Sequence, residues 1–250
     1  MAGYRERTLT SRYAAGVSTD PFIYALDFEG VPSTYASARD GIDALLRDRG
    51  LRKTSVADTA NSLARGAFAS AQLEGSTTNW EHFENGSGDE IARAAMTMAS
   101  QIISLVPTWR TAPIQVLARL HALSASYTDS PGTPVNEDGT NRLHELSSVL
   151  LKKTTAPGLI IAALVHAEVL SAQAFRSHNG MIARAAERIV LIASGVDPVS
   201  ITVPEVGHAA DATGYLNAIA AYQAGDVHSW LLYAADAFVR GAEAAPLNAK

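Results

Sequence analysis

Residues 173–184 read QAFRSHNGMIAR, and this stretch indicates the fold of the whole chain. It follows a strongly apolar segment and continues into a second run with helical spacing, so it predicts a helix, a short loop and another helix. The pair Asn179–Gly180 stands at the junction, where the free backbone N–H groups of the second helix favour negative charge. Gly180 lets a phosphate approach the backbone closely, and Arg184 follows about one turn later, within reach of the same anion. The stretch therefore predicts an anion-binding loop, although similar Asn-Gly junctions also occur in helical proteins that bind no anion.

Helical spacing also dominates the sequence on both sides of this loop. Ser55 and Asp58 form a helix N-terminal pattern, apolar residues recur behind them at helical spacing, and Gly75 suits the helix end. The stretch from Pro157 to Ser171 is apolar all round, which is typical of a helix at the centre of its domain. The expected helices span residues 32–49, 55–75, 90–106, 113–126, 142–152, 157–171, 181–194, 209–224 and 227–243. We expect a loop over residues 128–140 and a β-like run over residues 196–205. The predicted fold class is all-α, with little or no sheet.

The composition agrees with a globular helical protein and excludes several classes of function. The chain has 250 residues, 47% of them hydrophobic and 18% charged, with a net charge of −5 and no run of basic residues. Nucleic-acid binding would usually need a basic face, so we expect no nucleic-acid partner. The absence of cysteine excludes disulfides and thiolate chemistry. The N-terminal segment lacks the apolar stretch of a signal peptide, and the longest apolar run, residues 159–165, is too short to cross a bilayer. We therefore expect a cytoplasmic protein without a membrane partner.

The opening stretch resembles the signature loop of the Fic/Doc family, H-P-F-x-D/E-G-N-G-R-x-x-R. Phe175, Asn179, Gly180 and Arg184 match that pattern. Residues 165–175, VHAEVLSAQAF, are similar in pattern to the end of the family's central helix. Residues 215–226 end in Gly-Asp, as the corresponding family segment does. The resemblance implies a Fic-fold helical core over residues 111–245, preceded by additional helices within residues 1–110.

A segment further upstream resembles the inhibitory helix of many Fic proteins. The family pattern is S/T-x-x-x-E-G/N, and residues 70–75 read SAQLEG, with Ser70, Glu74 and Gly75 at the defining positions. These residues end the helix expected over about 55–75. In the family this glutamate pairs with the second arginine of the loop, which is Arg184 here, and blocks the place of the ATP γ-phosphate. The resemblance therefore implies a Glu74–Arg184 pair with an inhibitory role.

Three loop positions depart from the family pattern, and each removes a group that the family's reaction uses. The resemblance implies transfer of AMP from ATP, with Mg²⁺, to a hydroxyl group of a protein target. The position of the catalytic histidine holds Gln173, whose amide cannot act as a general base near pH 7. Ser177 replaces the acidic ligand of Mg²⁺, and Met181 replaces the first arginine. We therefore expect a nominal protein adenylyltransferase with impaired AMP transfer and no metal ligand in the loop. The residues expected to retain nucleotide or phosphate binding are Phe175, Ser177, His178, Asn179, Gly180 and Arg184.

Two other interpretations stay open. His178 stands where the family has glycine and is the novel titratable group of the loop, although the preferred interpretation is an exposed loop residue or one whose bulk narrows the anion site. The protein could therefore be an enzyme that transfers a different phosphate-containing group, with His178 as its base. Alternatively, the loop binds nothing and the chain is a non-catalytic protein-interaction module. The counterpart of the family's target-binding flap is expected at Thr128–Thr140, with acidic side chains at Asp129, Glu137 and Asp138.

The remaining histidines predict no second site. We expect His166 to make a hydrogen bond in the core, and His121 and His144 to be paired surface residues. His208 lies close to Glu205 in the sequence, but the two match no known metal-binding spacing.

Overall fold

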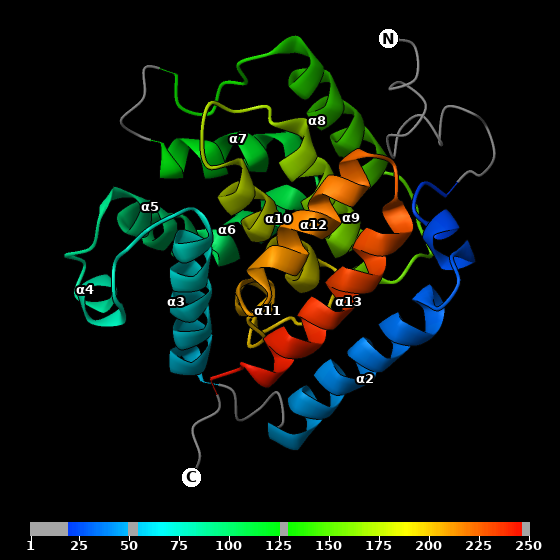
Figure 1. Cartoon of the computed structure of the whole chain (residues 1–250), viewed down its shortest axis with the longest axis horizontal. Helices are drawn as coiled ribbons and strands as arrows, with labels where there is room; N and C mark the ends of the chain where they lie inside the picture. Colours follow the sequence, from blue (N-terminus) through cyan, green and yellow to red (C-terminus); the bar gives the residue numbers. More distant parts are fainter. Residues whose placement is uncertain (1–19, 50–54, 126–129, 247–250) are drawn as a thin grey trace.

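The computed structural model describes residues 20–49, 55–125 and 130–246, and in these residues the chain folds into helices around one central pair (Figure 1). None of the described residues forms a β-strand, and no helix among them is both long and apolar enough to cross a bilayer. The elements in chain order are η1 (Ile23–Asp27), α2 (Val31–Arg49), α3 (Val56–Leu73), α4 (Trp80–Glu84), α5 (Glu90–Ala99), α6 (Ile102–Trp109), α7 (Pro113–Ser124), α8 (Glu137–Leu150), α9 (Gly158–Ala172), α10 (Asn179–Ala193), α11 (Pro204–Ala209), α12 (Ala212–Gln223) and α13 (Val227–Glu243).

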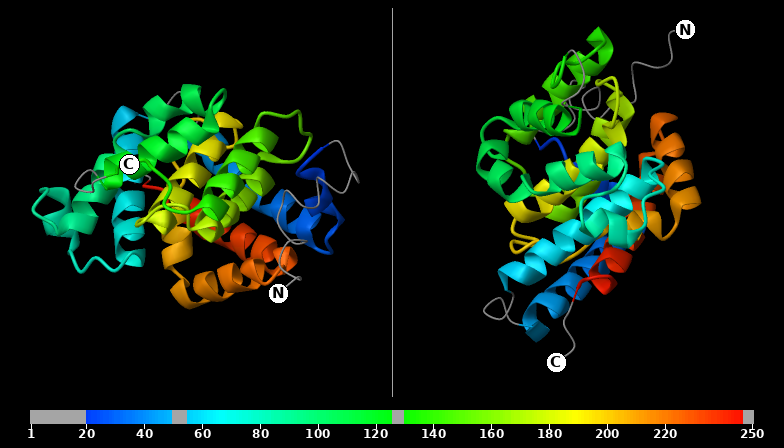
Figure 2. Two further views of the ribbon diagram at one scale, coloured as in Figure 1. Left: turned by 90° about the horizontal axis from the view of Figure 1, so that it is seen from above. Right: turned by 90° about the vertical axis from the view of Figure 1, so that its left-hand side faces the viewer.

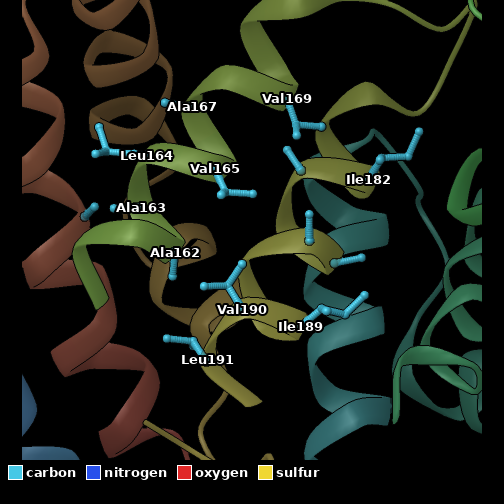
Figure 3. Packing of buried hydrophobic residues seen from close by; sticks show 14 of the residues in the cluster. Ala162, Ala163, Leu164, Val165, Ala167, Val169, Ile182, Ile189, Val190 and Leu191 are labelled. Carbon is cyan, nitrogen blue, oxygen red and sulfur yellow. The ribbon is translucent and has the colours of Figure 1, made fainter. Parts of the chain in front are cut away.

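The central pair consists of α9 and α10, which are joined by the loop that the sequence singles out. Nearly every side chain of both helices is buried, as the all-round apolar sequence of α9 predicts. Figure 3 shows small and branched side chains of the two helices facing each other, among them Val165, Val169 and Ile182. Trp230 of α13 anchors the pair, because its indole N–H donates a hydrogen bond of 2.8 Å to the carbonyl oxygen of Ala163. This rigid core fixes the ends of α9 and α10, and therefore the loop between them.

The other helices surround this pair on several sides. The helix α13 packs against α2, α11 and α12, and the two views of Figure 2 show α2 and α13 side by side. The helix α3 packs against α5, α11 and α10. One hydrophobic cluster includes residues on both sides of position 110, so the helices within 1–110 and 111–245 share a core. The division into these two parts stays a prediction from the resemblance.

The two ends of α3 confirm the sequence signals. The Ser55 hydroxyl oxygen accepts a hydrogen bond from the Asp58 backbone N–H, and the Asp58 carboxylate accepts one from the Ser55 N–H. These reciprocal bonds satisfy N–H groups that the first helical turn leaves free. At the other end Gly75 has φ of +94°, which a residue with a Cβ rarely adopts. The helix therefore stops at a fixed place and presents Glu74 at its C-cap.

The helix α5 also begins where the sequence predicts. The Asp89 carboxylate accepts hydrogen bonds from the Ala92 N–H at 2.8 Å and from the Ser76 hydroxyl at 2.7 Å. Burial acts to raise the pKa of Asp89, but these bonds and those from Thr77 and Thr78 lower it below its usual value. The carboxylate therefore joins the end of α3 to the start of α5.

The single helix expected over 90–106 is wrong, because α5 ends at Ala99 and α6 begins at Ile102. The hydroxyl of Ser100 donates to the Thr97 carbonyl, and the hydroxyl of Ser104 donates to the Gln101 carbonyl. Serine side chains compete in this way with the backbone hydrogen bonds of a helix. Apolar residues keep their helical spacing across the break between α5 and α6, so the sequence pattern does not predict that break.

The β-like run expected over 196–205 is also wrong. Its residues are extended in part but pair with no other strand in the described part of the chain, and α11 begins at Pro204. The buried Asp197 carboxylate accepts hydrogen bonds from the N–H groups of Ile201 and Thr202, at 3.1 and 2.8 Å. The N–H of Val203 donates to the Gly241 carbonyl at 2.8 Å. Because these contacts satisfy the backbone, the run needs no partner strand.

Several helix boundaries differ from the expectation by two to five residues. The helix α8 starts at Glu137, inside the expected loop, because the Asn136 side chain accepts a hydrogen bond from the Gly139 N–H and caps it. The helix α10 starts at Asn179 rather than at residue 181. The helix expected over 209–224 is preceded by a separate short helix, α11, and α12 itself begins at Ala212. In each case a cap or a turn, rather than the apolar period, decides the boundary.

Candidate functional site

The Asn179 side chain fixes the loop between α9 and α10. Its amide oxygen accepts a hydrogen bond from the Phe175 N–H at 3.0 Å, and its amide nitrogen donates to the Phe175 carbonyl at 2.8 Å. Both residues are buried. Because one side chain satisfies both backbone groups of Phe175, the loop is held in one shape. The matching positions Phe175 and Asn179 therefore have a structural role in forming the loop.

Gln173 ends α9 rather than facing the loop as a base would. It has a left-handed backbone with φ of 44°, which is unfavourable for a residue other than glycine. Its side-chain amide donates a hydrogen bond of 2.6 Å to the Leu170 carbonyl of the same helix. Its own carbonyl accepts a hydrogen bond of 3.0 Å from the Asn136 side chain at the start of α8. The side chain at the degenerate histidine position thus caps a helix.

Arg184 is the centre of the polar site at the beginning of α10. Only 2% of its side chain is exposed. Its Nη2 lies 2.8 Å from Oε1 of Glu74, its Nε donates to the Ser70 hydroxyl at 2.8 Å, and its Nη1 donates to the Tyr215 hydroxyl at 3.2 Å. Burial acts to lower the pKa of Arg184, but Tyr215 and Glu74 raise it above its usual value. The guanidinium group therefore stays charged in the interior.

Glu74 brings its carboxylate against the first turn of α10. A Cβ added at position 180 would overlap Oε1 of Glu74, so Gly180 is needed for this close approach. Glu74 is 20% exposed, and Ser70 places both its hydroxyl and its carbonyl on the same guanidinium group. The helix α3 therefore delivers a negative charge to a helix N-terminus, where backbone N–H groups favour an anion. The Glu74–Arg184 pair that the resemblance implies is present.

Ser177 and His178 precede the first turn of α10, and the charge of Glu74 acts on His178. Both are half-buried, and the Ser177 hydroxyl lies 3.2 Å from Nδ1 of His178. His178 has a left-handed backbone with φ of 59°. Burial lowers the pKa of His178 below its usual value, although Glu74 and Glu90 act against this shift. The imidazole is therefore neutral at pH 7 and able to accept a proton.

Met181, at the position of the family's first arginine, belongs to the hydrophobic core. It is 2% exposed and lines a small internal cavity together with Ala67, Met98 and Ala185. The side chain therefore points towards α3 and α5 rather than to the surface of the loop. An arginine at this position would place its charge among apolar side chains, which costs several kcal/mol.

The donor groups of the loop do not fit Mg²⁺. This ion prefers several hard oxygen ligands, usually including carboxylates. The loop offers the Ser177 hydroxyl, which already contacts His178, while the carboxylate of Glu74 is paired with Arg184. The first turn of α10, by contrast, does suit a phosphate oxygen, because the Glu74 carboxylate already occupies such a position beside Gly180.

The segment before α8, expected as the counterpart of a target-binding flap, contacts the loop through its backbone. The Val135 N–H donates a hydrogen bond of 2.8 Å to the Ala174 carbonyl. Glu137 and Asp138 lie in the first turn of α8 and are exposed, whereas Asp129 lies outside the described residues. The flap role of this segment stays a prediction.

The expectation that His121 and His144 are paired surface residues is wrong. His121 is 1% exposed, stacks on the ring of Phe175 at 4.6 Å and accepts a hydrogen bond from the Gly132 N–H at 2.9 Å. Only His144 is exposed. The stacking of His121 on Phe175 joins α7 to the loop, and it could not be predicted because α7 meets the loop only in the folded chain.

A buried polar network continues from Arg184 into the interior. The Tyr215 hydroxyl, 3.2 Å from Nη1 of Arg184, also lies 2.8 Å from Nε2 of His166, which confirms the expected core hydrogen bond of that histidine. Beyond it lie Glu187 and His208, and both side chains are fully buried. Burial lowers the pKa of His166 to about 4, despite the nearby carboxylate of Glu187. Sequence reasoning missed this group, because its members come from different helices.

Glu205, which lies close to His208 in the sequence, contacts a different residue. Its carboxylate receives a bidentate interaction from Arg188, with Nε to Oε1 at 2.8 Å and Nη2 to Oε2 at 2.5 Å. Arg188 is buried and also donates to Ser62 and Ser200. This ion pair joins α3, α10 and α11 and is structural.

The arrangement of helices is similar to that of solved Fic family structures. A Fic family protein from Desulfovibrio desulfuricans G20 superposes with a TM-score of 0.74 at 14% identity, over 86% of this chain and 74% of that chain. A segment of Fic-1 from C. elegans gives a TM-score of 0.67 at 14% identity, over 94% and 75%. A Glu-to-Gly variant of this segment gives 0.64 at 15%, over 93% and 75%. No protein-family model and no curated protein sequence matches the chain significantly. The chain therefore has the all-α fold of Fic proteins, as its sequence predicts.

Proposed function

We propose that this Fic-fold protein binds a nucleotide or another phosphate-bearing ligand at the start of α10, and that its transfer of AMP to a protein hydroxyl is impaired. The observation that carries the proposal is the Glu74–Arg184 ion pair beside Gly180. The carboxylate of Glu74, at the end of α3, is paired with the buried guanidinium group of Arg184 near the N-terminus of α10. This is the place where a phosphate oxygen would be stabilised by the same groups.

The inhibitory role of α3 follows from competition for one cation. Each nitrogen of the Arg184 guanidinium group donates a hydrogen bond: Nε to Ser70, Nη1 to Tyr215 and Nη2 to Glu74. Of these partners only Glu74 is charged and partly exposed, so it is the one that a phosphate could replace. Binding of a phosphate-bearing ligand would therefore require the Glu74 side chain to move away from the first turn of α10.

The impairment follows from three positions. The Gln173 amide is held by the Leu170 carbonyl and has no suitable protonation equilibrium. Loss of a general base typically lowers the rate by about a hundred- to ten-thousand-fold. Ser177 provides no carboxylate for Mg²⁺, and Met181 is buried in the core instead of neutralising phosphate charge. These changes reduce transfer and leave the anion site in place.

His178 carries the second candidate function, transfer of a different phosphate-containing group. Its imidazole is neutral at pH 7 and half-buried, and the field of Glu74 acts on it. A neutral imidazole at the edge of an anion site could remove a proton from an attacking hydroxyl group. This candidate requires that any transfer activity be lost in His178→Gln while ligand binding persists.

An assay with ATP labelled at the α-phosphate, together with cell lysate and Mg²⁺, separates these functions. We expect the wild-type protein and Glu74→Ala to bind ATP but to label no protein above the level of a heat-inactivated sample. Glu145→Ala, which removes an exposed carboxylate from α8, is the matched control. Labelling of protein from CDP-choline or another labelled phosphate donor, but not from this ATP, that depends on His178 would support the second candidate. Absence of any shift in melting temperature with ATP, GTP, CDP-choline or phosphate would favour a non-catalytic interaction module.

A further inference from the structure

Two histidines and one glutamate meet in the interior, away from the loop. His166 comes from α9, Glu187 from α10 and His208 from α11. All three side chains are 0% exposed, and a ligand atom from each lies within 4.8 Å of the others. Histidine and carboxylate side chains are charged or strongly polar, so three of them rarely share a closed interior without a partner.

The distances within this group suit atoms that share one metal ion. Nδ1 of His166 lies 3.1 Å from Oε1 of Glu187, and Nε2 of His208 lies 3.0 Å from Oε2. Two ligand atoms bound to a metal at about 2.0–2.2 Å are themselves about 3 Å apart. Each ring nitrogen therefore lies as far from a carboxylate oxygen as two ligands of one metal ion would, and the three residues each offer one donor atom.

Two of these atoms have no hydrogen bond within the described residues. Nδ1 of His166 and Oε1 of Glu187 are both buried, lie 3.1 Å apart and make no hydrogen bond to any other described group. Leaving a buried polar atom unpaired costs about 1–3 kcal/mol, and two such atoms facing each other need an explanation. A cation between them would satisfy both lone pairs at once.

The outward-facing ring nitrogens have the surroundings that metal-binding histidines usually show. Nε2 of His166 lies 2.8 Å from the Tyr215 hydroxyl, and Nδ1 of His208 lies 3.3 Å from the Tyr233 hydroxyl. A histidine that binds a metal through one nitrogen normally donates its other N–H to an oxygen, which fixes the ring and its tautomer. Each tyrosine oxygen occupies that position here, so Nδ1 of His166 and Nε2 of His208 both face Glu187.

We propose that His166, Glu187 and His208 bind one divalent first-row transition metal ion in the core of this protein. Two imidazoles and a carboxylate favour Zn²⁺, Fe²⁺, Co²⁺ or Ni²⁺ over the hard ions Mg²⁺ and Ca²⁺. The complete burial of the ligands makes the site structural, because no position is open to a substrate. The ion joins α9, α10 and α11, and it is loaded as the chain folds.

The test uses tag-free protein, because a histidine tag would itself bind metal. We expect protein refolded with Zn²⁺ to retain about one equivalent after exhaustive dialysis, and its melting temperature to fall when a strong chelator is present during refolding. Replacement of Zn²⁺ by Co²⁺ should give a visible absorption band with the intensity of a protein-bound, low-symmetry site. A melting temperature that is the same with Zn²⁺ and with chelator, and no retained metal, would overturn the proposal.

Variants locate the site. We expect Glu187→Gln to lose stoichiometric binding, and Tyr233→Phe, which keeps all three ligands, to weaken Zn²⁺ binding about ten- to a hundred-fold. His144→Gln removes an exposed histidine and should bind as the wild type does. Stoichiometric binding that is lost in His144→Gln or unchanged in Tyr233→Phe would contradict the assignment. If Glu187→Gln fails to fold, Tyr233→Phe and the wild-type Co²⁺ spectrum still decide the question.

Discussion

Replacement of Glu74 by alanine should make the protein less stable by itself and a better binder of phosphate-bearing ligands. The change removes the charged partner of Arg184 and leaves the guanidinium group with the neutral partners Ser70 and Tyr215. Because the side chain of Arg184 is 2% exposed, its contact with Glu74 is made with little competition from water, and its loss is costly. The two effects have the same cause and opposite signs.

The structure sets the size of both effects. A hydrogen bond to a charged group contributes about 1.5–3 kcal/mol, and Glu74 is mostly buried. We therefore expect a loss of about 1–3 kcal/mol in the free energy of unfolding, or roughly 3–10 °C in melting temperature for a chain of this size. If a phosphate oxygen takes over the same contact, removal of the competing carboxylate should tighten binding about 10- to 100-fold.

The assay measures melting temperature and ATP affinity for the wild type, Glu74→Ala, Glu74→Gln and Glu145→Ala. ATP at about a hundred times its dissociation constant should return about 2.7 kcal/mol to Glu74→Ala, which offsets most of the loss. We expect Glu74→Gln to be intermediate, since it keeps the shape and loses the charge, and Glu145→Ala to match the wild type. Equal ATP affinity in the wild type and Glu74→Ala, despite a lower melting temperature, would refute the competition between carboxylate and phosphate.

Three further changes test the site and its supports. Gly180→Ala should displace the carboxylate of Glu74 and lower the melting temperature by a few degrees in thermal unfolding. ATP affinity should not increase, because the new methyl group occupies the position that a phosphate oxygen would take. Met181→Arg should cost at least about 3 kcal/mol in urea unfolding and restore no AMP transfer, because it buries an unpaired charge; a melting temperature near the wild-type value would contradict this. Asp89→Ala should cost about 0.5–2 kcal/mol at pH 7. The pKa of Asp89 is lower in the folded than in the unfolded chain, so the ionised carboxylate stabilises the fold above the unfolded pKa of about 4. This stabilisation is lost as the pH falls through the lower folded pKa. The difference in free energy of unfolding between wild type and Asp89→Ala, measured with urea, should therefore narrow below about pH 4.

The sequence predicts those parts of the fold that depend on local signals. The Ser55–Asp58 cap, the left-handed glycine at position 75 and the buried helix α9 are all present. Each depends on residues within a few positions of one another, so the sequence pattern contains the needed information. The break between α5 and α6 depends on serine hydroxyl groups that bond to nearby carbonyls, and the apolar period does not register such bonds.

Some features of the candidate site could likewise be predicted from the sequence, and others could not. The loop and the Glu74–Arg184 pair could be predicted, because the resemblance joins two segments that lie far apart in the sequence. The capping role of Gln173 and the core position of Met181 could not, because each depends on where the neighbouring helices lie. The meeting of His166 with Glu187 depends likewise on the packing of two helices, and no sequence spacing encodes it.

Phosphate binding at Arg184 is tested most directly by a crystal structure of Glu74→Ala in complex with ATP. We expect a phosphate group to lie against the backbone N–H groups at the start of α10, beside Gly180, and within hydrogen-bond distance of the Arg184 guanidinium group. A nucleotide bound elsewhere on the protein, with Arg184 still held only by Ser70 and Tyr215, would contradict it.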